Sequence, residues 1–221
     1  PAMPKFQFLR SQKRVYDHLT DQYFSYSGPT SMGKSFIMRM FLKYQVESGV
    51  QKNFALIVPT KALINEVTSK VINDLKENLK ERNYRLVTSA GAIVLKEKHN
   101  FIFVLTPERL LYLLISNPDI PIHYLFVDEA HKLSEIDSRS PFYYKVIDKL
   151  LEREEKPHII FASPNIPNPE IYLKSIPDLE MSESRKLSSS FSPVTQFKFL
   201  ISFGQRSISM FNDYSESLTK V

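Results

Sequence analysis

Short runs of apolar residues alternate along the chain with longer stretches in which apolar residues recur every three or four positions. The short runs have the length of buried strands, and the longer stretches have the spacing of amphipathic helices. Strands and helices that alternate in this way are typical of a parallel sheet with helices on both faces. We therefore predict an α/β domain with strands at residues 23–27, 54–58, 84–88, 101–105, 124–127 and 159–162.

Two of the intervening segments carry an apolar stripe with helical spacing. Gly49 follows the first stripe and is placed to end that helix. Each stripe is predicted to face the core. The stripes are formed by Ile37, Met40, Phe41 and Tyr44, and by Ile64, Val67, Val71 and Leu75.

The chain has 221 residues, of which 43% are hydrophobic, and this is enough for one full core and part of another. After residue 178 the pattern changes, because residues 182–190 are rich in serine and Phe197, Phe199 and Ile201 alternate like a half-buried strand. We expect a tag remnant or disorder at 1–4, a first domain at 5–178, and a linker with the start of a truncated second domain at 179–221.

The charge and the amino-acid composition restrict the class of protein only loosely. The net charge of +5, from 29 basic and 24 acidic residues, permits binding to a polyanion. The absence of cysteine excludes disulfides, thiolate zinc sites and cysteine nucleophiles. No signal peptide and no apolar run of membrane-spanning length is recognisable, so we expect a cytoplasmic protein without a membrane partner.

Residues 28–35 fit the phosphate-loop pattern G-x-x-x-x-G-K-[ST], and they lie between a predicted strand and a predicted helix. Backbone N–H groups of such a loop bind phosphates, Lys34 reaches the β- and γ-phosphates, and the Ser35 hydroxyl binds magnesium. The loop therefore predicts a site for ATP and Mg²⁺. Its residues are Gly28, Pro29, Thr30, Ser31, Met32, Gly33, Lys34 and Ser35.

Asp128 and Glu129 directly follow the predicted strand at 124–127. Asp128 is expected to hold the magnesium ion through water, and Glu129 to orient or deprotonate the attacking water. The alternative is a pair of solvated carboxylates, but charge at the end of a buried strand is costly without a metal or a partner. Together with the phosphate loop, this pair predicts nucleoside triphosphate hydrolysis.

Several segments also resemble the motifs of superfamily 2 helicases, in the order in which that family carries them. Residues 128–131 read Asp-Glu-Ala-His, the DEAH form of motif II. The resemblance covers about residues 5–176 and implies a first RecA-like domain, and the string at 163–170 points to the Ski-like branch of DExH helicases. The other segments are 8–12 (Q-type motif), 59–63 (motif Ia), 106–109 (motif Ib) and 163–170 (motif III).

The resemblance implies roles for two further residues near ATP. The Gln12 amide would donate to and accept from the adenine edge, although a glutamine in such a sequence can also be a solvated helix residue. His131 would link ATP to the second domain, and the alternative is a surface histidine. Gln12 is assigned to ATP binding, and His131 joins Lys34, Asp128 and Glu129 as a catalytic residue.

Motifs Ia and Ib line the nucleic-acid backbone in this family. The residues concerned can equally cap helices, because Thr106 precedes Pro107 as a cap precedes the first helical residue. Both roles are compatible, since a helix N-terminus also binds phosphate. The candidate nucleic-acid contacts are Pro59, Thr60, Lys61, Thr106, Pro107 and Arg109.

Motif III couples hydrolysis to strand movement in the family, and Ser163 and Asn165 are its candidate coupling residues. Here Pro164 and Asn165 stand where the family has alanine and threonine. Proline cannot donate a backbone hydrogen bond, and asparagine replaces a hydroxyl with a longer amide. These two differences from the family therefore affect the motif that couples hydrolysis to strand movement.

The resemblance implies an ATP-dependent helicase or translocase that acts on DNA or RNA. A second RecA-like domain would supply an arginine finger, so the isolated fragment is expected to be a weak or inactive ATP hydrolase. One alternative is the double-stranded DNA translocase motor of a restriction or defence complex. Another is a regulatory ATP-binding module that does not unwind nucleic acid.

Overall fold

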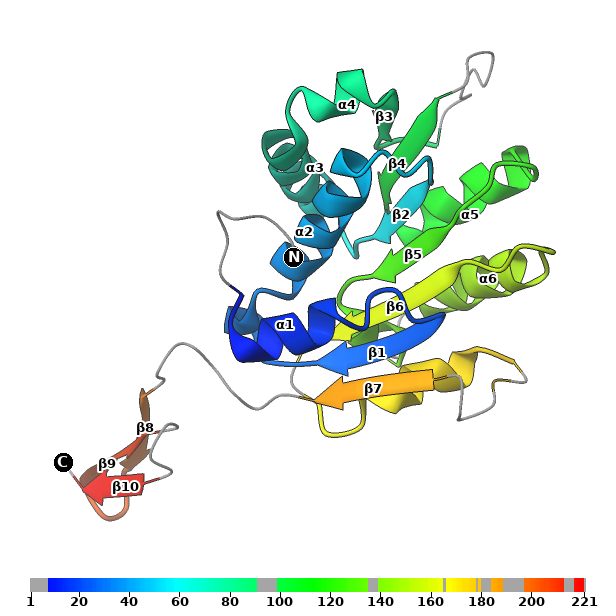
Figure 1. Cartoon of the computed structure of the whole chain (residues 1–221). Helices are drawn as coiled ribbons and strands as arrows, with labels where there is room; N and C mark the ends of the chain where they lie inside the picture. The colour runs from blue at the N-terminus through cyan, green and yellow to red at the C-terminus, as the bar shows by residue number, and fades with distance from the viewer. Residues whose placement is uncertain are drawn as a thin grey trace.

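The described part of the protein contains two separate β-sheets (Figure 1). Residues 1–7, and with them the expected remnant at 1–4, lie outside it. The computed structural model describes residues 8–90, 99–134, 139–164, 166–177, 179, 184–188, 197–212 and 217–220.

The larger sheet has seven strands in the order β3-β4-β2-β5-β6-β1-β7, and all neighbouring strands are parallel. Six of them are the strands predicted from the apolar runs, with ends that differ by one residue at most. The α/β fold with a parallel sheet is thereby confirmed. The strands are Tyr23–Ser27 (β1), Phe54–Ile57 (β2), Tyr84–Val87 (β3), Asn100–Leu105 (β4), Tyr124–Val127 (β5), His158–Ser163 (β6) and Ser184–Ser188 (β7).

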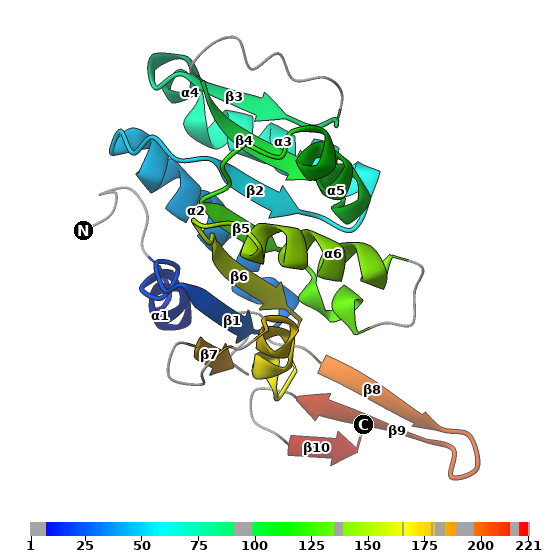
Figure 2. The same cartoon turned by 90° about the vertical axis from the view of Figure 1, so that its right-hand side faces the viewer.

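Helices cover both faces of this sheet, and alternate strand residues enter a core on each side (Figure 2). None of the described helices is both long and apolar enough to cross a membrane. One face carries α1 (Arg10–Tyr16), α2 (Lys34–Glu47), α3 (Lys61–Leu75) and α4 (Asn78–Glu81). The other carries α5 (Pro107–Ser116), α6 (Ser140–Leu151) and the 3-10 helix η3 (Pro169–Ser175).

The predicted apolar stripes are buried with one exception. All four stripe residues of α3 and the first three of α2 lie in the core, but Tyr44 is 38% exposed. Val46 is buried in the last turn of α2 instead, and a tyrosine at the edge of the core keeps its hydroxyl near water. Gly49 follows the end of α2 with φ +80°, as predicted for a residue that ends a helix.

The parallel arrangement brings the carboxyl ends of the strands to one edge of the sheet. Backbone hydrogen bonds continue the strand register into the loops that follow: the Val58 N–H donates to Leu105, the Asp128 N–H to Ile57, and the Gly28 N–H to Ser163. Doubly wound sheets bind their ligands at this edge. All the sequence motifs that follow strands in this chain therefore lie on the same side of the molecule.

The segment Ser184–Ser188 differs from its expected place in the linker. It forms β7 at the edge of the larger sheet and pairs with β1 in parallel. Pairing at an edge uses backbone N–H and C=O groups, so a largely polar strand can join, and its Leu187 packs against the core. An ion pair of 2.5 Å between Lys186 and Glu170 ties β7 to η3. The first sheet therefore extends beyond residue 178.

The smaller sheet is antiparallel and contains β8 (Phe197–Ser202), β9 (Ser207–Asn212) and β10 (Ser217–Lys220). The strand predicted from the alternation of Phe197, Phe199 and Ile201 exists, but it is not half buried, because Phe199 is 59% exposed and Ile201 is 60% exposed. Among the described elements, these strands pack mainly against one another. Within the described residues, no second layer packs on this sheet, so its apolar side chains stay exposed.

Candidate functional site

The phosphate loop runs from the end of β1 to the start of α2. Thr30–Met32 forms a 3-10 turn, and Gly33 follows with φ +76° and ψ 42°. This left-handed conformation favours glycine. A Cβ atom at Gly33 would also lie 3.3 Å from the amide nitrogen of Gln12. The local sequence thus determines how the loop turns into α2.

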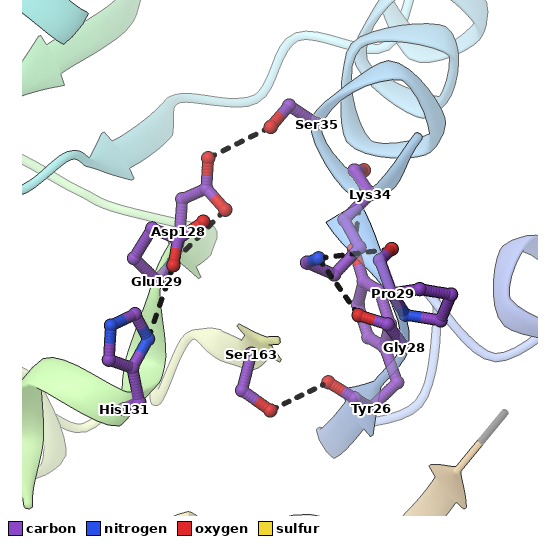
Figure 3. A network of polar contacts seen from close by, with 9 residues as sticks. All are labelled: Tyr26, Gly28, Pro29, Lys34, Ser35, Asp128, Glu129, His131 and Ser163. Carbon is purple, nitrogen blue, oxygen red and sulfur yellow. Dashed lines mark hydrogen bonds and ion pairs between the residues drawn. The ribbon is translucent and has the colours of Figure 1, made fainter. Parts of the chain in front are cut away.

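Lys34 is only 4% exposed and points back into its own loop (Figure 3). Its ammonium group donates to the carbonyl oxygens of Gly28 at 3.0 Å and Pro29 at 3.4 Å. Burial lowers the pKa of Lys34, whereas the charges of Glu129 and Asp128 act in the opposite direction. The loop therefore holds a positive charge at the position where a phosphate group would need it.

Ser35, in the first turn of α2, and Asp128, directly after β5, come together. The Ser35 hydroxyl donates to Oδ2 of Asp128 at 2.9 Å, and Oδ1 of the same carboxylate accepts the Glu129 N–H at 3.0 Å. Burial raises the pKa of Asp128, and the hydrogen bond from Ser35 partly offsets this effect. Hydroxyl and carboxylate oxygens are ligands that suit Mg²⁺, so the donor set fits the predicted metal.

Glu129 begins the 3-10 helix η2 (Ala130–Leu133) in a left-handed conformation, with φ 53° and ψ 47°. Such a conformation is unfavourable for a residue with a side chain and is concentrated at functional sites. Its carboxylate oxygen Oε2 lies 3.2 Å from Nδ1 of His131. The turn therefore places the two DEAH side chains against each other beside Asp128 (Figure 3).

Gln12 lies beside the phosphate loop, but its amide group makes contacts within the protein. Its Oε1 accepts the Leu9 N–H, and its Nε2 donates to the Met32 carbonyl, both at 2.9 Å. Gln12 thereby connects α1 to the loop, which the sequence pattern did not indicate. The adenine contact stays a prediction and would require these bonds to change.

Ser163 is fully buried and joins β6 to β1. Its hydroxyl donates to the Tyr26 carbonyl at 3.4 Å, and its own carbonyl accepts the Gly28 N–H at 3.3 Å. It is thus connected to the first residue of the phosphate loop. Asn165, the second candidate coupling residue, lies outside the described residues.

The motif Ia segment supports both readings of the sequence. The Thr60 hydroxyl oxygen accepts the Leu63 N–H at 3.3 Å and caps α3, as the capping interpretation predicts. Lys61 is exposed, and its side chain has no hydrogen-bond or ion-pair partner within the described ranges. Lys61 is therefore available for a phosphate contact, whereas Thr60 has a structural role.

The motif Ib segment is more deeply embedded. Thr106 is 6% exposed and makes no side-chain capping bond to α5, although Pro107 occupies the first turn as predicted. Arg109 donates from Nη1 to the Thr88 carbonyl at 2.8 Å. This bond connects α5 to the chain just after β3. The capping interpretation therefore does not extend to the Thr106 side chain.

A guanidinium group that the sequence did not single out connects these two segments. Arg139 donates from Nη1 to the Pro59 carbonyl at 2.6 Å, and its Nε lies 3.2 Å from Oε1 of Glu108. Pro59 belongs to motif Ia and Glu108 to motif Ib. A sequence signal for this contact is missing, because its partners are far apart along the chain.

The comparison with protein families agrees with this geometry. A family model described as DEAD/DEAH box helicase matches residues 10–171. MJ1574, an uncharacterized ATP-dependent helicase of Methanocaldococcus jannaschii, is 28% identical over 162 residues, which cover 66% of this chain and 24% of that protein. The chain thus spans about a quarter of the length of this relative.

Solved helicase structures share the fold. The helicase domain of Hef from Pyrococcus furiosus has a TM-score of 0.61 at 15% identity, and the match covers 85% of this chain and 40% of that chain. The DUF1998 helicase MrfA has a TM-score of 0.62 at 14% identity, with coverages of 84% and 31%. MrfA bound to DNA has a TM-score of 0.61 at 15% identity, with coverages of 92% and 28%.

Proposed function

The chain belongs to the DEAD/DEAH box helicase family, and we propose that it is the first RecA-like domain of an ATP-dependent helicase or translocase that moves along DNA or RNA. The observation that carries this proposal is the hydrogen bond between Ser35 of the phosphate loop and Asp128 of the DEAH segment. It joins the phosphate-binding and water-activating motifs in one site. The motif III string at 163–170 supports assignment to the Ski-like branch.

In the proposed site, ATP binds with its phosphates at residues 28–35. The Lys34 ammonium group exchanges the carbonyls of Gly28 and Pro29 for phosphate oxygens, which is favourable because the new partners are charged. Ser35 and Asp128 would hold Mg²⁺, which when bound offsets charge on the transferring phosphoryl group. The buried position of Lys34 strengthens its interaction with phosphate.

Glu129 is the group that would align the attacking water, since it follows Asp128 and faces the same edge of the sheet. His131, 3.2 Å from Glu129, would transmit the state of this site to a second RecA-like domain. That domain would also supply an arginine finger, which typically contributes about 10³–10⁵ in rate. The chain alone is therefore proposed to bind ATP and to hydrolyse it slowly.

Nucleic acid would cross the surface formed by motifs Ia and Ib. Lys61 supports this proposal because its charge is exposed at the N-terminus of α3, where backbone N–H groups also favour phosphate. Thr60 and Arg109 would shape the surface through their contacts with Leu63 and Thr88. Contacts to phosphates carry no sequence information, so binding should be independent of sequence.

The proposal is tested by calorimetry of ATP binding in the presence of Mg²⁺, and by single-turnover phosphate release. Lys34→Ala should weaken ATP binding at least about tenfold, because it removes a charged phosphate contact. Glu129→Gln should preserve binding and lower the already slow hydrolysis, because it removes only the carboxylate that aligns water. Lys43→Ala, on the same helix and away from the loop, is the matched control. Equal ATP affinity in Lys34→Ala and Lys43→Ala would overturn the proposed site.

A further inference from the structure

We propose that Arg139 is a positioning residue for the nucleic-acid surface, which it organises by holding motif Ia against motif Ib. This inference rests on the proposed function. Arg139 lies just before α6, and its side chain contacts a backbone carbonyl of one motif and a carboxylate of the other. It thus connects the loop after β2 to the first turn of α5, which follows β4.

The geometry of the contact favours arginine over other cations. A guanidinium group carries several N–H donors in a rigid plane, so Nη1 can donate to Pro59 while Nε faces Glu108. A lysine ammonium group is a single point charge and cannot hold both partners in the same orientation. The Glu108 carboxylate orients the guanidinium group of Arg139. The bond from this group to Pro59 restrains the loop two residues before Lys61.

The placement of Lys61 is what this restraint affects. The Arg139 side chain is 48% exposed and that of Glu108 is 32% exposed, so the ion pair by itself contributes little to stability. The bond to Pro59 acts on the backbone just before α3, whose first residue is Lys61. Loss of the restraint should therefore move a phosphate-binding charge without unfolding the domain.

The helix that follows Arg139, α6, also contacts the segment just after the DEAH residues. The Ser140 hydroxyl donates to the Lys132 carbonyl at 3.0 Å, and the Tyr144 hydroxyl donates to the Leu133 carbonyl at 3.2 Å. Both acceptors belong to η2, which directly follows Glu129. The start of α6 thus contacts the end of η2, just after motif II, through two side chains, and motifs Ia and Ib through Arg139.

The experiment measures binding of fluorescein-labelled single strands of unrelated sequence by anisotropy, using the full chain over a range of salt concentrations. Arg139→Gln should weaken binding about fivefold at low salt, the scale on which residues that do not touch a ligand commonly act. Arg139→Lys keeps the charge but loses the planar guanidinium group, so its loss of affinity should be nearly as large as that of Arg139→Gln. Lys149→Gln, which removes an exposed positive charge from the last turn of α6, is the matched control and should bind like the wild type.

A double-mutant comparison separates positioning from direct contact. If Arg139 acts by placing Lys61, then Arg139→Gln should cost clearly less in a Lys61→Ala background than in the wild type. Equal costs in the two backgrounds, or full rescue by Arg139→Lys, would overturn the inference. ATP affinity and the thermal melting temperature should be unchanged in Arg139→Gln, which checks that the domain is folded.

The outcomes also separate this inference from the proposed function. A loss of affinity in Lys61→Ala together with wild-type binding by Arg139→Gln would overturn the role of Arg139 alone. A wild-type chain that binds no single strand at low salt would overturn both the nucleic-acid surface and the inference that rests on it.

Discussion

The two sheets of this protein each contain a strand with two phenylalanines, and these two strands have opposite surroundings. Phe101 and Phe103 of β4 alternate with apolar residues and are 4% and 0% exposed, whereas Phe199 of β8 is 59% exposed. The strand β4 lies between helices on both faces, while β8 belongs to a sheet without a second described layer. A continuous apolar run and an alternating one both predict a strand, but the burial of its side chains depends on what packs against it.

Replacement of a phenylalanine in each sheet should give the largest difference between them. Phe103→Ala should lower the free energy of unfolding by about 3–5 kcal/mol, because it leaves a cavity in a closed core. Phe199→Ala should change it by less than about 0.5 kcal/mol, because the ring is exposed. Urea unfolding measures both. Similar losses in the two variants would mean that the smaller sheet is covered in solution.

Shortening the chain should locate the boundary between the two regions. A chain ending at residue 190 keeps β7, whereas one ending at 183 leaves β1 paired with β6 alone, with its outer edge unpaired. We expect 1–190 to melt within about 2 °C of the full chain, and 1–183 to lose roughly 2 kcal/mol of stability, about 4 °C or more. Identical melting of the two shortened chains would show that β7 does not stabilise the larger sheet.

A smaller effect, a dependence of the free energy of unfolding on pH, should arise from a histidine beside the larger sheet. Burial lowers the pKa of His123, whose Nδ1 accepts the Asn53 N–H at 2.9 Å. The folded state therefore prefers the neutral imidazole. The contribution of His123 to the free energy of unfolding is complete above about pH 6.5 and decreases as the pH falls below that value.

The loss attributable to His123 should be below about 1 kcal/mol between pH 7 and 5.5. Urea unfolding over this range, compared between the wild type and His123→Gln, measures it. The variant should show a shallower decline of stability with falling pH. Parallel pH profiles would remove His123 as the source of the effect.

The sequence by itself determined the features that depend on local pattern. Six strands of the larger sheet were predictable because each is a short apolar run between turn or helix signals. The phosphate loop was predictable for a similar reason: Gly33, Lys34 and Ser35 have their chemistry in consecutive residues. Asp128 and Glu129 could be placed at a strand end because the buried strand before them is adjacent in the chain.

Only the tertiary structure decided the features that depend on distant partners. The strand β7 forms through backbone pairing with β1, and Leu187 is its one apolar side chain packed against the core, which is too little for an apolar pattern in the sequence. Gln12 bonds to Met32, and Arg139 joins Pro59 to Glu108, through side chains whose partners are separated by long stretches of sequence. Hydrogen bonds require atoms within about 3 Å, and a one-dimensional pattern does not specify which distant carbonyl or carboxylate folding brings that close.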